Sequence, residues 1–150
     1  MAVLERCLLE IIRRHEIWRT TFEAAAGEPI QIVHPAPRVF PLPVTDLRKL
    51  PEAEREAEAV RLATGDAWRP FDLKTGPLMR ASLVRMDDER YRLYMTVHQI
   101  ISDAVSAYRV FLPELATLYE AFAAGKPSRL PDLPIQYADF AYWQRKRWSD

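Results

Sequence analysis

The sequence predicts an α/β (α+β) fold in which helices form a layer on strands. Three patterns predict it: apolar residues at helical spacing from the N-terminus, two alternating apolar segments joined by a short polar turn, and two further helical patterns after them. Helices and strands mixed in this order favour a layered fold over a helical bundle. The 150 residues suit one domain, which buries about two-thirds of its unfolded surface.

The first third of the chain predicts a helix, two short strands and a connector. The stripe of the helix, which covers residues 2–17, consists of Leu4, Leu8, Ile11 and Ile12. Strands are expected at residues 18–22 and 29–33, on either side of a turn at Gly27. Residues 34–45 hold four prolines and can only form an extended connector or edge segment. Because the helical pattern starts without a capping segment, we expect that some upstream structure is missing.

The middle of the chain predicts a second helix followed by a β-hairpin. The helix starts at Pro51, a residue type that fits the first helical position. Its narrow apolar stripe consists of Ala53, Ala57, Val60, Ala63 and Ala67. The hairpin strands are predicted at residues 79–86 and 90–98. Side chains alternate between the two faces of a strand, so His98 is expected to share a face with Thr96, opposite the more apolar row.

A third helix is predicted after the hairpin. Ser102 is its expected N-cap, with Asp103 in its first turn. Pro113 removes a backbone donor and predicts a kink near Arg109, and Gly125 ends the helix. The expected buried face consists of Val105, Tyr108, Leu112, Leu115, Tyr119 and Phe122.

The charge balance argues against a nucleic-acid partner. The chain has 21 Lys and Arg against 21 Asp and Glu, so no global field attracts nucleic acid or anionic lipid. A final helix, predicted at residues 137–148, carries a basic run at 145–147 that we interpret as a solvated face. No apolar run reaches the ~20 residues of a membrane span and no signal-peptide pattern is present, so the expected compartment is the cytoplasm.

The single cysteine and the three histidines make two kinds of site unexpected. Cys7 has no partner cysteine, which excludes a disulfide or a thiolate metal site within the chain, and we interpret it as a small core residue. The histidines are scattered, without a pair at i,i+4, so no metal site is expected. His34 lies in the proline-rich connector and is expected to be exposed.

The junction between the second hairpin strand and the following helix is the segment most suggestive of function. Polar groups at a strand end, beside a helix N-terminus, lie where a site can stabilise developing negative charge. From these residues alone two interpretations stay open. His98 is either a site residue or a buried histidine with satisfied hydrogen bonds, and Asp103 either serves the site or only complements the helix dipole.

Four segments together resemble the condensation domains of nonribosomal peptide synthetases. Residues 14–22 read Arg-His-Glu-Ile-Trp-Arg-Thr-Thr-Phe and resemble the family's Arg-His-Glu-x-Leu-Arg-Thr-x-Phe, with Trp18 in place of leucine. Residues 70–81 contain Pro-Phe-Asp-Leu and then Gly-Pro-Leu-Met-Arg-Ala, similar to a second motif. Residues 98–104 resemble the signature His-His-x-x-x-Asp-Gly, and residues 136–143 are similar to the closing motif of the first lobe. The segments stand in the family's order over nearly the whole chain.

The resemblance implies one chloramphenicol-acetyltransferase-like lobe, a two-layer sandwich of a mixed sheet packed by helices. The complete family domain has two such lobes, with the active site in a tunnel between them. Residues 1–150 are then expected to be a partial condensation domain, without the first strand segment and the whole C-terminal lobe, and inactive in isolation. The family joins an acyl or peptidyl thioester to the amine of an aminoacyl acceptor, which forms an amide bond.

The resemblance also implies the partners. Both substrates arrive on the phosphopantetheine of peptidyl or acyl carrier protein domains, so no cofactor or metal is expected to bind the chain directly. The other expected partners are the adenylation domain of the synthetase and the C-terminal lobe of the same domain. An exposed apolar face is expected where that second lobe docks.

Two changes fall inside the signature. Gln99 stands where the family has its second histidine, usually regarded as catalytic, and Ala104 replaces the glycine. An imidazole exchanges a proton near neutral pH, whereas a carboxamide only donates and accepts hydrogen bonds. If the missing histidine is a base, the loss is on the order of 10²–10⁴ in rate; if it positions the amine, Gln99 retains part of the function. Ala104 either narrows the tunnel or simply suits a helix better.

The other motif residues are given mainly structural roles. His98 is expected to brace the junction. Adjacent strand residues point to opposite faces, so only one of the two positions should face the pocket unless the strand has already ended there. Asp103 is expected to act as an ion-pair or packing residue, with Arg19 as its first candidate partner. His15 is assigned to packing in the lobe interior. The remaining motif residues are Arg14, Ser102, Tyr137, Asp139 and Trp143.

Two functions from different classes fit the altered signature. The first is an amide-forming condensation domain that is impaired by Gln99. The alternative is a non-catalytic, condensation-like platform that recruits tailoring enzymes or carrier proteins. A heterocyclisation or epimerisation relative fits less well, because the first would carry aspartate in place of His98 and the second normally keeps both histidines.

Overall fold

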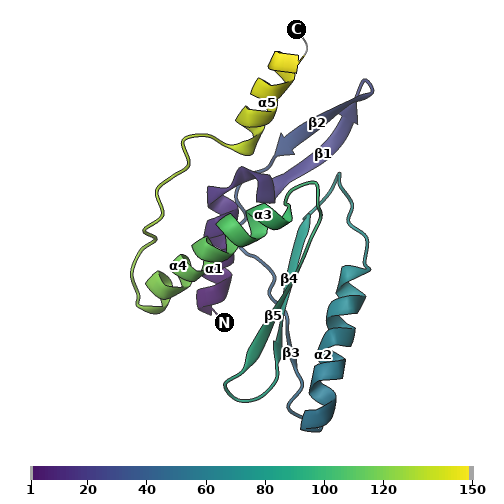
Figure 1. Cartoon of the computed structure of the whole chain (residues 1–150), viewed down its shortest axis with the longest axis vertical. Helices are drawn as coiled ribbons and strands as arrows, with labels where there is room; N and C mark the ends of the chain where they lie inside the picture. The colour runs from purple at the N-terminus through teal and green to yellow at the C-terminus, as the bar shows by residue number, and fades with distance from the viewer. Residues whose placement is uncertain (1, 149–150) are drawn as a thin grey trace.

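Helices and short strands are mixed along the chain (Figure 1). The computed structural model describes residues 2–148. The elements in chain order are α1 (Ala2–Arg14), a 3-10 helix (Glu16–Arg19), β1 (Thr20–Ala25), β2 (Glu28–Val33), β3 (Val44–Asp46), α2 (Glu52–Ala67), β4 (Met79–Arg85), β5 (Tyr91–Val97), α3 (Ala104–Ser106), a π-helical turn (Ala107–Phe111), α4 (Leu112–Ala123) and α5 (Tyr137–Trp148). The predicted α/β class is therefore confirmed.

The strands form two small sheets. β1 and β2 make an antiparallel hairpin, and the second sheet has the order β3-β4-β5. In the second sheet β3 is parallel to β4, whereas β5 is antiparallel to it, with Met79 opposite Val97 and Leu83 opposite Leu93. This sheet is therefore mixed, as the resemblance implied.

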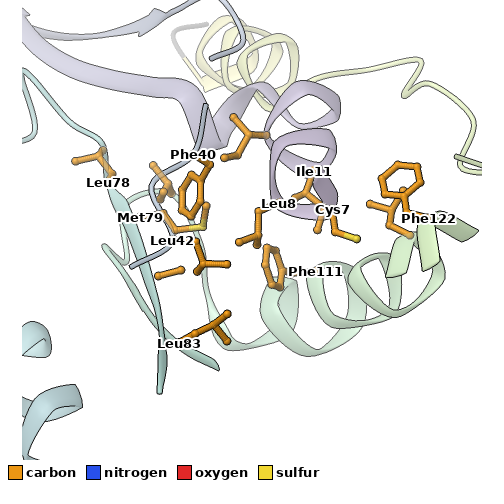
Figure 2. Close-up of a cluster of buried hydrophobic side chains, with 14 of the residues drawn as sticks. Cys7, Leu8, Ile11, Phe40, Leu42, Leu78, Met79, Leu83, Phe111 and Phe122 are labelled. Atoms are coloured by element: carbon orange, nitrogen blue, oxygen red, sulfur yellow. The ribbon is translucent and has the colours of Figure 1, made fainter. Parts of the chain in front are cut away.

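The main core lies between the three-stranded sheet and the helices α1 and α4 (Figure 2). Its buried residues include Cys7, Leu8, Ile11, Phe40, Leu42, Leu78, Met79, Leu83, Phe111, Leu118 and Phe122. Truncation of a buried leucine such as Leu8 to alanine costs about 2–5 kcal/mol. Cys7 is fully buried, as predicted for a core residue, and burial raises the pKa of its thiol to about 11.

Helix α2 packs on the other face of this sheet through an unpredicted side. Ala59 and Leu62 face the sheet, whereas Val60 of the predicted stripe is 50% exposed. The prediction was wrong because two polar side chains orient the helix: Arg55 donates to three main-chain carbonyls, and Asp66 accepts a hydrogen bond from β5. These positions share one helix face with Ala59 and Leu62 and hold it against the sheet.

The side chains of β5 alternate as predicted. The row facing the main core consists of Leu93, Met95 and Val97. On the other face, Tyr94 packs with the α2 cluster, and Thr96 Oγ1 donates to Asp66 Oδ2 of α2 at 2.8 Å. The strand that leads into the junction thus packs against the main core on one face and against α2 on the other.

The first helix ends three residues earlier than predicted, and the first strand starts two residues later. α1 stops at Arg14, and the chain continues as a 3-10 turn in which Trp18 N donates to the carbonyl O of His15 at 3.1 Å. Trp18 therefore lies outside the hairpin. Its ring packs edge-on against Phe111 with the centroids 5.3 Å apart, and so closes one side of the core.

Chain reversals and helix ends agree better with the prediction. The turn at Gly27 is confirmed: Ala26 and Gly27 both have positive φ, 53° and 84°, which is typical of a two-residue hairpin turn. Pro51 is the N-cap of α2, whereas it was predicted to be the first helical residue, so the helix starts one residue later, at Glu52. Gly125, with φ of 68°, ends α4. The N–H of Lys126 then donates to the carbonyl O of Ala121 at 2.8 Å.

The helical segment after the junction buries a face that only partly matches the predicted one. In its π-helical turn the N–H of Leu112 donates to Ala107, five residues earlier, beside the helix-disrupting Pro113. The predicted kink near Arg109 takes this form. The wide turn brings Phe111 and Leu118 inward, while Phe122 and Leu115 of the predicted face are buried or packed against the core as predicted. Four residues of the predicted face are exposed instead: Val105, Tyr108, Leu112 and Tyr119.

Helix α5 has the predicted bounds, and its basic run at residues 145–147 is exposed. None of the described helices is both long and apolar enough to cross a membrane. Between residues 2 and 148, no three side chains of metal-binding type gather at one place.

Candidate active site

A tight turn connects β5 to α3. His98 N donates to the carbonyl O of Leu78 at 3.0 Å, and the buried Ile101 donates its N–H to the carbonyl O of His98 at 3.1 Å. Asp103 then adopts an extended conformation, and its Oδ1 accepts from the N–H of Ser106 at 2.7 Å. Asp103 is therefore the N-cap of α3. The assignment of Ser102 to this position was wrong, because the carboxylate reaches the free N–H of the first turn from one residue further along.

His98 and Gln99 face different surroundings. The Nδ1 atom of His98 accepts the N–H of Ile100 at 3.1 Å, and its ring lies edge-on to Phe71 with the centroids 5.9 Å apart. Gln99 instead lines a cavity of about 580 Å³, and His98 is outside that lining. Only one of the two positions therefore lines this cavity, but β5 already ends at Val97, so the turn and not strand alternation separates them.

The cavity is formed by three parts of the chain that are distant in sequence. They are the segment after α1, the β5–α3 junction with the helix that follows it, and the segment that leads into α5. The polar side chains of its wall are His15, Gln99, Ser102, Asp103, Ser106, Glu114 and Tyr137. The apolar wall includes Ile17, Trp18, Ile101, Val110, Phe111 and Leu133. Three of the four resembling segments therefore meet at one place.

A buried charge cluster borders this cavity. Glu114 Oε1 lies 3.1 Å from Arg14 Nε, and Glu114 Oε2 lies 2.7 Å from His15 Nε2. The Arg14 side chain is 6% exposed, and its Nη1 atom has no hydrogen-bond partner among the described residues. Sequence reasoning missed Glu114. The available signal was an acidic residue within the apolar stripe that contains Phe111 and Leu118.

Gln136 is the second site residue that was not singled out. Its Nε2 donates to the carbonyl O of Arg14 at 2.9 Å, and its Oε1 accepts the N–H of Glu16 at 3.1 Å. Asp139 Oδ2 in turn accepts the N–H of Gln136 at 2.9 Å, which caps α5. Gln136 thus fixes the start of α5, including Tyr137, at the cavity.

A family model with the description Condensation domain matches residues 1–149 of the chain. The chain belongs to the condensation-domain family. It is 47% identical over 145 residues to chondramide synthase cmdD of Chondromyces crocatus, in an alignment that covers 97% of this chain but 4% of that protein. As a condensation domain of the nonribosomal peptide synthetase type, it corresponds to an N-terminal portion of the domains that it matches.

Solved structures agree with this assignment. The X-domain in the complex of X-domain and OxyB from teicoplanin biosynthesis matches with a TM-score of 0.80 at 30% identity, over 99% of this chain and 30% of that one. The starter condensation domain of rhizomide synthetase RzmA matches with a TM-score of 0.85 at 21% identity, over 99% and 35%. The second match shows the shared fold. The chain thus spans about a third of these solved chains.

The pairing of Arg19 with Asp103 in this condensation domain was a wrong expectation. Arg19 Nη2 lies 3.1 Å from Glu16 Oε1, and its Nη1 donates to the carbonyl O of His34. The carboxylate of Asp103 accepts the N–H of Ser106, and this hydrogen bond holds the pKa of Asp103 below its usual range. The two side chains are separated because Arg19 stays with the 3-10 turn and the hairpin. His34 is exposed, as expected.

The remaining motif residues lie at the margin. Ala104 is the exposed first residue of α3 and is outside the cavity lining. Trp143 is also outside it, 5.9 Å from Phe140 between ring centroids along α5. Large apolar side chains are exposed on both helices that border the cavity: Val105, Tyr108, Leu112, Tyr142 and Trp143. Both helices therefore expose apolar side chains beside the cavity.

Proposed function

We propose that this chain is part of a condensation domain that joins a carrier-bound acyl or peptidyl thioester to the amine of a carrier-bound aminoacyl acceptor. The observation that carries the proposal is the position of Gln99, on the wall of the cavity beside the capped start of α3. In amide formation the amine attacks the thioester carbonyl carbon and loses a proton, and the thiol leaves. A side chain at position 99 would meet these reacting groups.

Gln99 can assist only part of this reaction. Its amide N–H can donate to the developing oxyanion, and its carbonyl oxygen can accept from the amine. A carboxamide does not take up a proton near neutral pH, so a base function at this position is lost. We therefore propose an impaired enzyme, slower by about 10²–10⁴ than one with an imidazole acting as base at position 99.

The substrates define the partners. Both arrive on phosphopantetheine arms, so carrier protein domains, an adenylation domain and the other lobe of the domain are the proposed partners, in the cytoplasm. Because the chain spans about a third of related solved chains, we expect no activity from it alone. Phosphopantetheine enters as part of the substrates, and the chain itself needs no bound cofactor in this scheme.

The experiment compares the intact domain with its Gln99→His variant, using one donor-loaded and one acceptor-loaded carrier protein. We expect slow amide formation that the variant accelerates by about 10²-fold or more. Gln144→His is the matched control, because Gln144 is exposed on α5 and outside the cavity lining. Equal amide formation by wild type and Gln99→His would contradict the proposed impairment.

A second candidate function is a non-catalytic platform. It is favoured by the match to an X-domain in complex with OxyB, at 30% identity. Such a role would place no demand on a histidine at position 99. If neither the intact domain nor its Gln99→His variant forms an amide while carrier proteins still bind, the platform is the better account. The coding sequence on either side is a further test, because an elongating order of adenylation and carrier domains favours catalysis.

A further inference from the structure

The cavity that lacks an imidazole at position 99 has one at another position. Among the described residues of its lining, His15 is the only histidine, and its side chain is 15% exposed. It follows α1 directly, at the start of the 3-10 turn, and reaches across to α4. The same lining that contains Gln99 therefore also contains a side chain able to accept a proton.

Glu114 fixes the protonation pattern of this ring. The His15 Nε2 atom lies 2.7 Å from Glu114 Oε2, and Arg14 holds the other carboxylate oxygen at 3.1 Å. An ionised carboxylate only accepts hydrogen bonds, so the hydrogen of this contact belongs to Nε2. In neutral His15 the lone pair is then on Nδ1, which makes Nδ1 the basic atom. A histidine whose second nitrogen is fixed by a carboxylate is the arrangement that orients a general base.

The other titratable groups of the wall are less suited to this role. Glu114 is occupied by Arg14 and His15. Asp103 accepts the N–H of Ser106, and this hydrogen bond lowers the pKa of Asp103 and makes its carboxylate a weaker base. Asp103, Glu114 and Tyr137 are the other titratable side chains of the described cavity lining, and Arg14 joins the cluster through Glu114.

We propose that His15 is the general base of this site and that Glu114 and Arg14 are its positioning residues. This rests on the proposed condensation function. The amine nitrogen bonds to the thioester carbonyl carbon, and its proton passes to Nδ1 of His15. The carbon–sulfur bond then breaks, and the leaving thiolate takes this proton, which yields the amide and a free thiol.

The test uses the intact domain with loaded carrier proteins and the variant His15→Gln. We expect a rate lower by about 10²-fold. The acid limb of the pH–rate profile should also become flatter, because only the amine, and no longer His15 as well, must be deprotonated before the reaction. Combining it with Gln99→His should restore the rate, which a purely structural defect would not permit. His34→Gln, an exposed histidine outside the lining, is the matched control and should leave rate and profile unchanged.

Two results would overturn the base role. One is an unaltered pH profile in His15→Gln, whatever its rate. The other would come from ¹⁵N spectra of the wild-type domain, in which the His15 signal is assigned by its loss in the variant. A neutral His15 ring with the hydrogen on Nδ1 and none on Nε2 would contradict the base role. If wild type forms no amide at any pH, the condensation function itself fails, and the spectra still report the predicted tautomer separately.

Discussion

Glu114 on α4 and Arg14 at the end of α1 form a buried ion pair, with Oε1 and Nε 3.1 Å apart. The same carboxylate also holds His15, and the carbonyl oxygen of Arg14 accepts a hydrogen bond from Gln136. One acidic side chain therefore links the two core helices to the segment that begins the cavity. The site and the core share this cluster, so stability and function are coupled here.

Replacing Glu114 with alanine should destabilise the fold by about 3–5 kcal/mol, because the buried guanidinium of Arg14 loses its charge partner. Urea unfolding followed by circular dichroism measures the loss. Glu120→Ala is the matched control, since Glu120 is exposed on the same helix and should change the free energy of unfolding by about 0.5 kcal/mol or less. Equal effects of the two substitutions would show that the pair is not a structural link.

Asp66→Asn should loosen α2 from the sheet in a pH-dependent way. Burial acts to raise the pKa of Asp66, but the hydrogen bond from Thr96 and the charge of Arg80 outweigh it and leave the pKa below 3.8. A depressed folded-state pKa contributes stability above the unfolded value and loses it as the pH falls.

The variant should therefore cost about 1–2 kcal/mol at pH 7, allowing for partial exposure of the carboxylate. The difference from wild type should shrink on acidification below pH 3.8. Unfolding free energies at both pH values measure it, with Glu54→Gln, an exposed site on α2, as control. A difference that is the same at both pH values would contradict the ionised role of Asp66.

Gln136→Ala should release α5 from the rest of the fold. Two hydrogen bonds to the main chain of Arg14 and Glu16 are lost, worth about 1–2 kcal/mol together. We expect faster hydrogen exchange of the α5 amides by about tenfold, measured by mass spectrometry. Gln144→Ala, the same change at an exposed position of α5, should leave the exchange as it is. Unchanged exchange in Gln136→Ala would mean that other contacts hold α5.

Cys7 predicts a loss of stability at alkaline pH. Burial raises the pKa of its thiol to about 11 from an ordinary 9.0, so the unfolded chain releases this proton first. Stability should therefore fall as the pH rises from 9 toward 11. The midpoint of urea unfolding at pH 8 and pH 10.5 measures this, and Cys7→Ala should lose less over the same interval. A larger alkaline loss in Cys7→Ala would contradict it.

Local chemistry made much of the fold predictable. The alternation in β5, the turn at Gly27 and the helix end at Gly125 depend on neighbouring residues alone, and all three are confirmed. The inward faces of α2 and α4 were not predictable in this way. They depend on polar contacts distant in sequence and on a π-helical turn, which shifts the register of every following side chain.

The candidate site was predictable at its junction but not across its wall. The involvement of Gln99 follows from the motif that it resembles, whereas its place on the cavity wall depends on the turn that follows β5 at Val97. The roles of Glu114 and Gln136 arise only when the chain brings α4 and α5 back to the end of α1. The acidic residue in the apolar stripe of α4 marks Glu114 as unusual, but its pairing with Arg14 depends on helix packing.

Position 99, and not position 98, is the one that faces the substrates in this account. The direct measurement places a cysteine at each position of the intact domain and offers a carrier protein whose pantetheine arm ends in an α-bromoacyl group. Gln99→Cys should form the covalent complex, and His98→Cys should not; the native Cys7 is buried and of low reactivity. Labelling of His98→Cys with Gln99→Cys left unmodified would contradict the account.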